Sequence, residues 1–125
     1  MILDTNALSA FIDGDTAVGS ALGAQPRAAI PVIVLGEFRY GIAGSRHRKT
    51  YEAWLASHLR DFDLLPIVDA TTFHYATLRA ALKKRGRPIP ANDVWIAALA
   101  LQHRLPVLTR DEHFDFVTEI QCVAW

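Results

Sequence analysis

Hydrophobic residues along the chain form short continuous runs that alternate with longer stretches of helical spacing. A short apolar run bounded by turn residues is typical of a buried strand. We expect strands at five such runs, which cover residues 2–3, 28–30, 64–68, 106–108 and 120–123. Pro66 has no backbone N–H for strand pairing, so the run at 64–68 is predicted to lie at a sheet edge.

The stretches between these runs predict helices. Thr5 or Asn6 is expected to cap a first helix that Gly14 ends, and residues 15–23 are expected to form a second. Pro31 suits the first turn of a third helix. A 3.6-residue apolar period predicts a fourth helix over 48–60.

Two further helices follow in the second half of the chain. Asp69 is expected to cap one that stops at the basic sequence LKKRGRP, where lysines, a glycine and a proline mark a helix end. The other covers residues 91–103 and is apolar on most sides. The side chains expected to face inward from the helix that begins at Asp69 are Phe73, Ala76, Ala80 and Ala81.

Short strands alternating with helices predict an α/β domain, with a central, mostly parallel sheet flanked by α-helices. The 125 residues are expected to form a single domain, over 1–125. In parallel sheets, sites form beyond the carboxyl ends of the strands. Asp4 follows the first predicted strand and Asp111 follows the strand at 106–108, so both are expected at the same edge.

Composition indicates the cellular compartment in which this domain is expected. Hydrophobic residues make up 51% of the chain, yet no apolar run is long enough to span a bilayer, so no membrane association is expected. The N-terminus lacks the basic region followed by an apolar segment that marks a secretory signal, because the acidic Asp4 is only the fourth residue. The single Cys122 has no partner for a disulfide and is expected to be a small buried hydrophobe. We therefore expect a cytoplasmic protein.

Charge is balanced overall but uneven along the chain. Thirteen basic and thirteen acidic residues give no net charge, which disfavours a generic nucleic-acid binder. Five basic residues and no acid lie between Asp69 and Asp93, and a second basic segment lies between Glu37 and Glu52. These segments are either solvated helix ends or local contacts for phosphate.

Four carboxylates lie in apolar surroundings or beside predicted strands. Glu37 has apolar or small residues at every helical neighbour position, and Asp93 sits in the first turn of the apolar helix at 91–103. Local roles are available for three of the acids: Asp93 favours the helix dipole, with Asn92 as the cap, and Asp4 and Asp111 suit turns. Glu37 is harder to explain locally, because an unpaired buried carboxylate costs several kcal/mol.

Convergence of these acids would require a cation. Two carboxylates about 5 Å apart repel by ~3 kcal/mol at an effective dielectric constant of about 20. A cluster of oxygen ligands selects a hard divalent ion, Mg²⁺ or Mn²⁺. The five histidines show no paired metal-ligand spacing, so zinc is not expected. A carboxylate site of this kind suits phosphoryl chemistry.

Four blocks of the sequence carry a resemblance to a known family: ILDTNALSAF, VIVLGEFRYGI, PIPANDVWIAALAL and LPVLTRDEHF. In order and spacing, over essentially the whole chain, they resemble the PIN-domain ribonucleases, in particular the VapC-type toxins of toxin–antitoxin pairs. The resemblance implies an Mg²⁺- or Mn²⁺-dependent endoribonuclease, a homodimer and a cognate antitoxin protein. RNA as the substrate comes from the resemblance, whereas metal and phosphate chemistry also follow from the residues.

The resemblance also assigns residues. It implies catalysis and metal binding by Asp4, Glu37, Asp93 and Asp111, the last at a position that varies between Asp and Asn in the family. Polar residues beside these acids would orient a carboxylate or hold a water molecule at the metal, and they are Thr5, Asn6, Thr109 and Asp115. Candidates for contacts to the RNA backbone are Arg39, Arg46, Arg48, Lys83, Lys84, Arg85, Arg87 and Arg110.

Three other functions fit the residues less well. A haloacid-dehalogenase-like phosphatase needs a second Asp two residues after the first, where this chain has Asn6. A response-regulator receiver needs an early acidic pair and an Asp at the end of a mid-chain strand, which Asp69 does not provide. A catalytically silent PIN-like interaction module is the remaining alternative.

Overall fold

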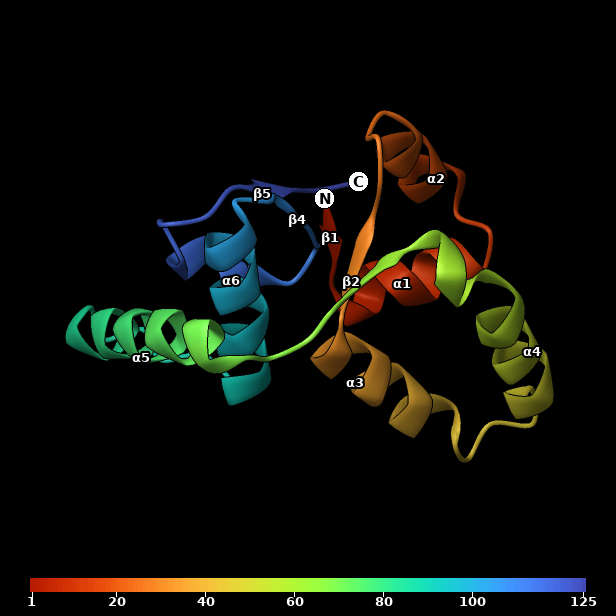
Figure 1. Cartoon of the computed structure of the whole chain (residues 1–125), viewed down its shortest axis with the longest axis horizontal. Coiled ribbons are helices and arrows are strands. Elements are labelled where there is room, and N and C mark those ends of the chain that lie inside the picture. The colour runs from red at the N-terminus through yellow and green to blue at the C-terminus, as the bar shows by residue number, and fades with distance from the viewer.

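Five short strands form one parallel sheet in the computed structural model, which describes all residues from 1 to 125 (Figure 1). The order across the sheet is β3-β2-β1-β4-β5. All four pairings are parallel, as the sequence predicts. The strands are β1 (Ile2–Leu3), β2 (Ala29–Pro31), β3 (Asp63–Leu65), β4 (Val107–Leu108) and β5 (Cys122–Val123).

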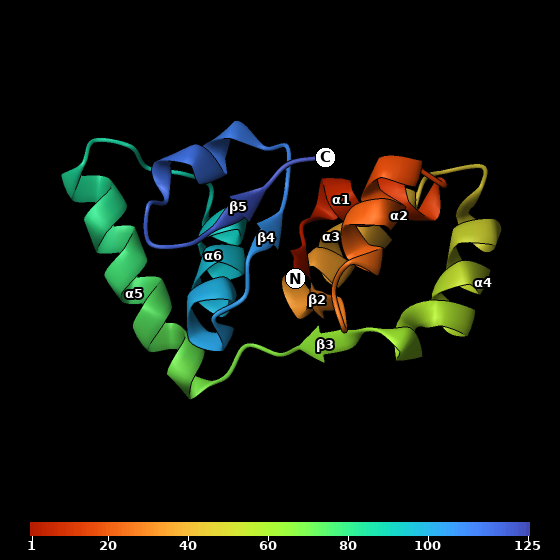
Figure 2. The same cartoon turned by 90° about the horizontal axis from the view of Figure 1, so that it is seen from above.

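Six α-helices flank this sheet on two sides. Figure 2 shows α5 and α6 on the left, beside β4 and β5, and the other four helices on the right. The helices are α1 (Thr5–Ile12), α2 (Thr16–Gly23), α3 (Val32–Ile42), α4 (Arg48–His58), α5 (Asp69–Lys84) and α6 (Ala91–His103). Two 3₁₀ segments, η1 (Leu59–Asp61) and η2 (Glu112–Phe116), complete the chain. No helix has both the length and the apolar character needed to cross a bilayer.

The sheet reverses its direction of growth between β1 and β4. From β1 the chain builds outward through β2 to β3, whereas β4 and β5 lie on the opposite side of β1. Ile2 pairs with Val107 and Leu3 with Leu108, so β1 and β4 end side by side. Crevices that bind ligands form at such a reversal, beyond the carboxyl ends of the strands. Asp4 and Asp111 therefore share one edge, as expected.

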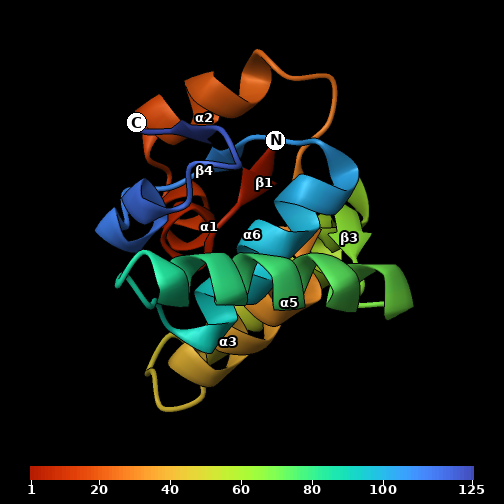
Figure 3. The same cartoon turned by 90° about the vertical axis from the view of Figure 1, so that its left-hand side faces the viewer.

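The inward face of α5 differs from the expected one. Phe73 is 71% exposed and Ala76 and Ala80 are exposed, whereas Leu78 and Leu82 are buried. Figure 3 shows α5 lying across α6, and the face that meets α6 begins with a polar residue, Thr71. Its hydroxyl donates to Oε1 of Gln102, 2.6 Å away on α6, and accepts from the backbone N–H of Val68. A hydrogen-bonded threonine on the buried stripe explains why apolar spacing alone misplaced this face.

Several smaller expectations are also wrong. The N-cap of α5 is Val68, and Asp69 is the first residue of that helix. Pro31 ends β2 and precedes α3 instead of lying in its first turn. The N-cap of α1 is Asp4, not Thr5 or Asn6. The N-cap position of α6 is Pro90, which has no side chain to bond the helix, so Asn92 is not the cap. Cys122 is exposed, because β5 is an edge strand that few residues cover. The edge position predicted for the strand at 64–68 is confirmed, but this strand, β3, covers Asp63–Leu65 and ends before Pro66.

The packing of α5 predicts unequal responses to truncation. We expect Leu78→Ala to lower the free energy of unfolding by about 2–5 kcal/mol, because a fully buried leucine leaves a cavity. Phe73→Ala should cost about 0.5 kcal/mol or less, since its ring is mostly in solvent. Urea unfolding followed by circular dichroism checks both values, and a tenfold dilution separates any effect of self-association. A larger loss for Phe73→Ala at both dilutions would contradict this packing.

Candidate metal centre

Asp4 is a buried carboxylate at the end of β1, with only 3% of its surface exposed. Its Oδ1 accepts a hydrogen bond from the backbone N–H of Ala7 at 2.7 Å, which caps α1. Its Oδ2 accepts a hydrogen bond from the hydroxyl of Thr109, which follows β4. Asp4 therefore starts a helix and also joins the ends of two neighbouring strands.

Asp111 is held by the loop that follows β4. Its backbone N–H donates to the Thr109 hydroxyl oxygen at 2.9 Å, so one threonine connects Asp4 with Asp111. Its Oδ1 accepts from the backbone N–H of His113 at 2.9 Å and so caps η2. These bonds fix where the Asp111 carboxylate lies relative to Asp4.

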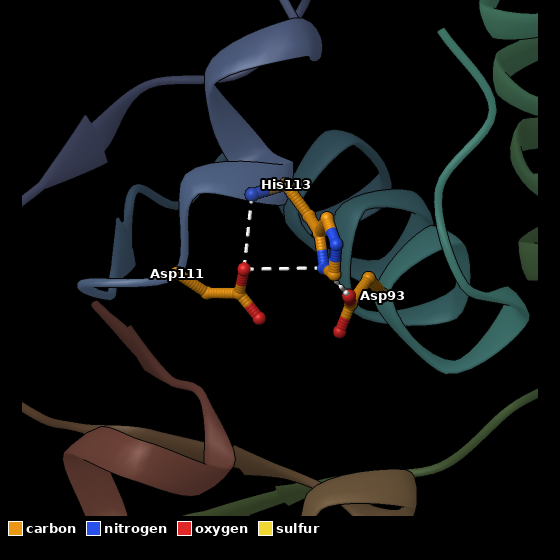
Figure 4. A group of neighbouring side chains, drawn as sticks. All are labelled: Asp93, Asp111 and His113. Carbon is orange, nitrogen blue, oxygen red and sulfur yellow. Dashed lines mark hydrogen bonds and ion pairs between the residues drawn. The ribbon is translucent and has the colours of Figure 1, made fainter.

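Asp93, Asp111 and His113 form a compact group of ligand atoms. Nδ1 of His113 lies 3.1 Å from Oδ2 of Asp93 and 3.2 Å from Oδ1 of Asp111. One ligand atom from each residue lies within 4.8 Å of the other two. Figure 4 shows the imidazole between the two carboxylates, with Asp93 carried by α6. The group could hold a divalent ion.

His113 was not anticipated from the sequence. The expected cluster contained only oxygen ligands, because no two histidines share a metal-ligand spacing. In the structure a single histidine joins two of the acids, Asp93 and Asp111. The signal that could have found it is local: His113 follows Asp111 by two residues in a loop after a strand, where the backbone can turn both side chains to one side.

Glu37 projects from α3 and is half-buried. Its Oε1 is buried and has no hydrogen-bond partner. A buried carboxylate oxygen without a partner is costly, so it calls for a donor or a cation. Glu37 also lines a pocket of about 320 Å³ whose wall includes Thr5 and Tyr51.

Mutual repulsion links all four acids. Burial raises the pKa of Asp4 above its ordinary range, and the charges of Asp111 and Glu37 raise it further, against the hydrogen bonds from Thr109 and Ala7. Burial likewise raises the pKa of Asp93, again with Asp111 and Glu37 adding to the effect. The nearby His113 acts in the opposite direction on Asp93. Asp111 and Glu37 are therefore close enough to oppose the ionisation of Asp4 and of Asp93.

The other polar residues predicted at the site differ in position. Thr109 is buried against Asp4, and Thr5 is half-buried in the pocket that Glu37 lines. Asn6 and Asp115 are exposed. Asp115 lies in η2 and is not part of the group formed by Asp93, Asp111 and His113.

Most of the candidate RNA-contacting arginines already have partners within the chain. Arg39 and Arg48 both pair with Glu52, and Arg85 pairs with Glu119 at 2.9 Å. Arg87 lies over the ring of Phe116, and Arg110 lies over that of Trp125. Nε of Arg46 donates to Nε2 of His47 at 3.2 Å. The remaining two candidates, both exposed, are Lys83 and Lys84.

Comparison with known protein families identifies the domain to which these residues belong. The family model of the PIN domain matches residues 1–119, which include all four acids and His113. The chain belongs to the PIN-domain family. The resemblance seen in the four sequence blocks is thereby confirmed.

Relatives of this PIN domain include VapC proteins. Ribonuclease VapC5 of Mycobacterium tuberculosis is 36% identical over 90 residues, which cover 70% of this chain and 67% of the relative. The crystal structure of VapBC2 from Rickettsia felis, bound to a DNA fragment from their promoter, contains a similar chain. The TM-score is 0.87 at 26% identity, over 99% of this PIN domain and 97% of that chain. The crystal structure of FitAcB from Neisseria gonorrhoeae also contains a similar chain. Its TM-score is 0.85 at 29% identity, over 97% of this PIN domain and 94% of that chain.

The raised pKa of Asp93 predicts how stability depends on pH in EDTA. Because the folded-state pKa lies above the ordinary 3.8, the ionised carboxylate destabilises the fold at neutral pH. That destabilisation is absent below the unfolded-state pKa and grows as pH rises through the folded-state pKa. We therefore expect Asp93→Asn to unfold at a higher temperature than the wild type at pH 7, and the difference to shrink toward pH 4.

Thermal unfolding from pH 4 to 7, with EDTA throughout, measures this difference. Glu112→Gln is the control, because Glu112 is an exposed acid of the same loop and is not one of the clustered ligands. An Asp93→Asn protein that is less stable than the wild type at pH 7 in EDTA would contradict the expectation.

Proposed function

We propose that this PIN domain is a metal-dependent endoribonuclease, the toxin of a type II toxin–antitoxin pair. The observation that carries the proposal is the grouping of Asp93 and Asp111, with Asp4 connected to Asp111 through Thr109 and Glu37 close enough to raise the pKa of Asp4 and of Asp93. Names of its relatives support the reaction class, since VapC5 is a ribonuclease.

The residues present fit a divalent cation. Their charges oppose one another, and Oε1 of Glu37 is buried without a partner. Carboxylate oxygens are the ligands that Mg²⁺ and Mn²⁺ prefer. We propose that Asp4, Glu37, Asp93 and Asp111 hold this ion.

The ion, when bound, would neutralise the acids, attract a phosphodiester and stabilise the negative charge that develops on it. Residues of the chain itself orient the carboxylates that would hold the ion. Thr109 and the Ala7 amide orient the Asp4 carboxylate. Glu37 is proposed to help hold the ion or to position the attacking water, and in-line attack would leave a 5′-phosphate and a 3′-hydroxyl.

Basic residues around this edge are proposed to hold the RNA backbone. Lys83 and Lys84 are exposed and can contact phosphates at little cost, and Arg46 is exposed but already donates a hydrogen bond to His47. Arg39, Arg48 and Arg85 would first have to exchange an acidic partner for a phosphate. Arg87 and Arg110 rest on aromatic rings, which leaves part of each guanidinium for other contacts.

An antitoxin protein and a second copy of the chain are the proposed partners, in the cytoplasm. Likeness to the VapBC2 and FitAcB structures supports the antitoxin. Large apolar side chains on the surface support association, since Tyr40 is 86% exposed and Phe73 is 71% exposed.

Cleavage of an end-labelled pool of structured RNA tests the proposed activity. We expect cuts with 5′-phosphate ends in Mg²⁺ or Mn²⁺, and none in EDTA. Loss of a residue that only orients a metal ligand costs about 10–100-fold, so Asp93→Asn should lower the rate by more than about 100-fold. Asp69→Asn is the control, because Asp69 is an exposed acid at the start of α5.

Two outcomes would count against this function. Binding of Mn²⁺ that depends on Asp93, without any cleavage, would favour the silent interaction module. Cleavage that survives both EDTA and Asp93→Asn would mean that the carboxylates do not form the active site.

The hydroxyl of Thr109 offers a test of how Asp4 is positioned. Thr109→Val keeps the shape of the buried side chain but removes the donor to Asp4 and the acceptor for the Asp111 amide. We expect it to weaken Mn²⁺ binding by about 10–100-fold, as for other residues that orient ligands. Thr109→Ser retains the hydroxyl and should stay within a few-fold of the wild type. Isothermal titration with Mn²⁺ measures both, and equal affinities for the two variants would refute this role.

A further inference from the structure

We propose that His113 is itself a ligand of the divalent ion and makes the centre a mixed nitrogen and oxygen site. This inference rests on the proposed metal-dependent function and adds a fifth residue to its ion. The ligand atom would be Nδ1, which faces both carboxylates (Figure 4).

Distances around Nδ1 fit a shared ion. Neighbouring ligand atoms of an octahedral ion with bonds of about 2.1 Å lie about 3.0 Å apart. Nδ1 of His113 is 3.1 Å from an oxygen of Asp93 and 3.2 Å from an oxygen of Asp111. Nδ1 is thus spaced as a neighbour of both oxygens in one coordination shell, and ligand atoms of the two carboxylates lie within 4.8 Å of each other.

The backbone holds His113 in this position. Its amide donates to Oδ1 of Asp111, and the next residue, Phe114, is 2% exposed and anchors η2 in the core. The ring is therefore presented from a fixed turn. Its side chain is 48% exposed, so an ion can reach the site from solvent.

No lysine or arginine side chain takes the place that His113 occupies. Within 4 Å, Asp93 and Asp111 each contact one basic side chain, that of His113. An imidazole nitrogen is a common ligand of divalent transition metals. An ion bound between these residues would satisfy both acids and the ring nitrogen.

A nitrogen ligand changes which ion the centre prefers. Mg²⁺ favours oxygen ligands and keeps much of its water, whereas imidazole suits transition metals. We therefore expect Mn²⁺ to bind more tightly than Mg²⁺, with part of that preference supplied by His113. Removal of the ring should weaken Mn²⁺ binding by about 10-fold or more and Mg²⁺ binding by less.

Pulsed electron paramagnetic resonance of the Mn²⁺-loaded protein tests the ligand directly. A coordinating imidazole gives a ¹⁴N modulation in the electron spin echo of Mn²⁺. We expect this modulation in the wild type and in His103→Ala, the control, because His103 is exposed at the far end of α6. It should be absent from His113→Ala, and ¹⁵N-labelled histidine in the wild-type chain should replace it by a ¹⁵N signal. Titration of each protein with Mn²⁺ and Mg²⁺ measures the preference.

The outcomes separate this inference from the function on which it rests. Mn²⁺ that binds in an Asp93-dependent manner without ¹⁴N modulation would overturn ligation by His113 and leave the metal-dependent function standing. Modulation that persists in His113→Ala would overturn it too. Failure of Mn²⁺ to bind the wild-type protein would remove the proposed function and the inference together.

Discussion

Asp4 is buried where the sheet reverses its strand order, and its ionised form loses hydration there while facing the charges of Asp111 and Glu37. Two hydrogen bonds, from Ala7 and Thr109, offset part of this cost. The same two bonds start α1 and tie the end of β1 to the end of β4. The first helix and the two central strands thus depend on a carboxylate that the fold makes difficult to ionise.

Burial of α6 likewise both stabilises the fold and positions a carboxylate of the site. Val94 and Ile96 are almost fully buried within two turns of Asp93, so the start of the helix has little freedom to move. Asp93 remains 15% exposed by its side chain, enough for a ligand to reach it. An apolar helix fixed in the core therefore presents a charged group at the edge with small positional error, as a precise site requires. Repulsion among the acids is tolerated because the core supplies the stability that they remove.

Sequence patterns predicted the parts of this structure that depend on the backbone and on apolar spacing. The parallel sheet, α6 and the shared edge of Asp4 and Asp111 follow from short strands that alternate with helices. The face of α5 did not follow, because the hydrogen bond of Thr71 to Gln102 puts a polar residue on the buried stripe. His113 did not follow either, since a single histidine in a turn carries no periodic signal. Both misses concern a polar side chain that contacts α6 from another part of the chain.

The loop after β4 connects the chemistry of the site to the stability of the fold. Oδ1 of Asp111 caps η2 through the His113 amide and also faces the His113 ring. An ion bound by Asp111 would leave the hydrogen bond from the His113 amide in place, because a carboxylate oxygen has two lone pairs and Asp111 has a second oxygen. Binding to the folded chain alone would then stabilise η2, α6 and β1 together, by an amount set by the ion's concentration relative to its dissociation constant. The carboxylates that weaken the metal-free fold would be the same groups through which an ion strengthens it.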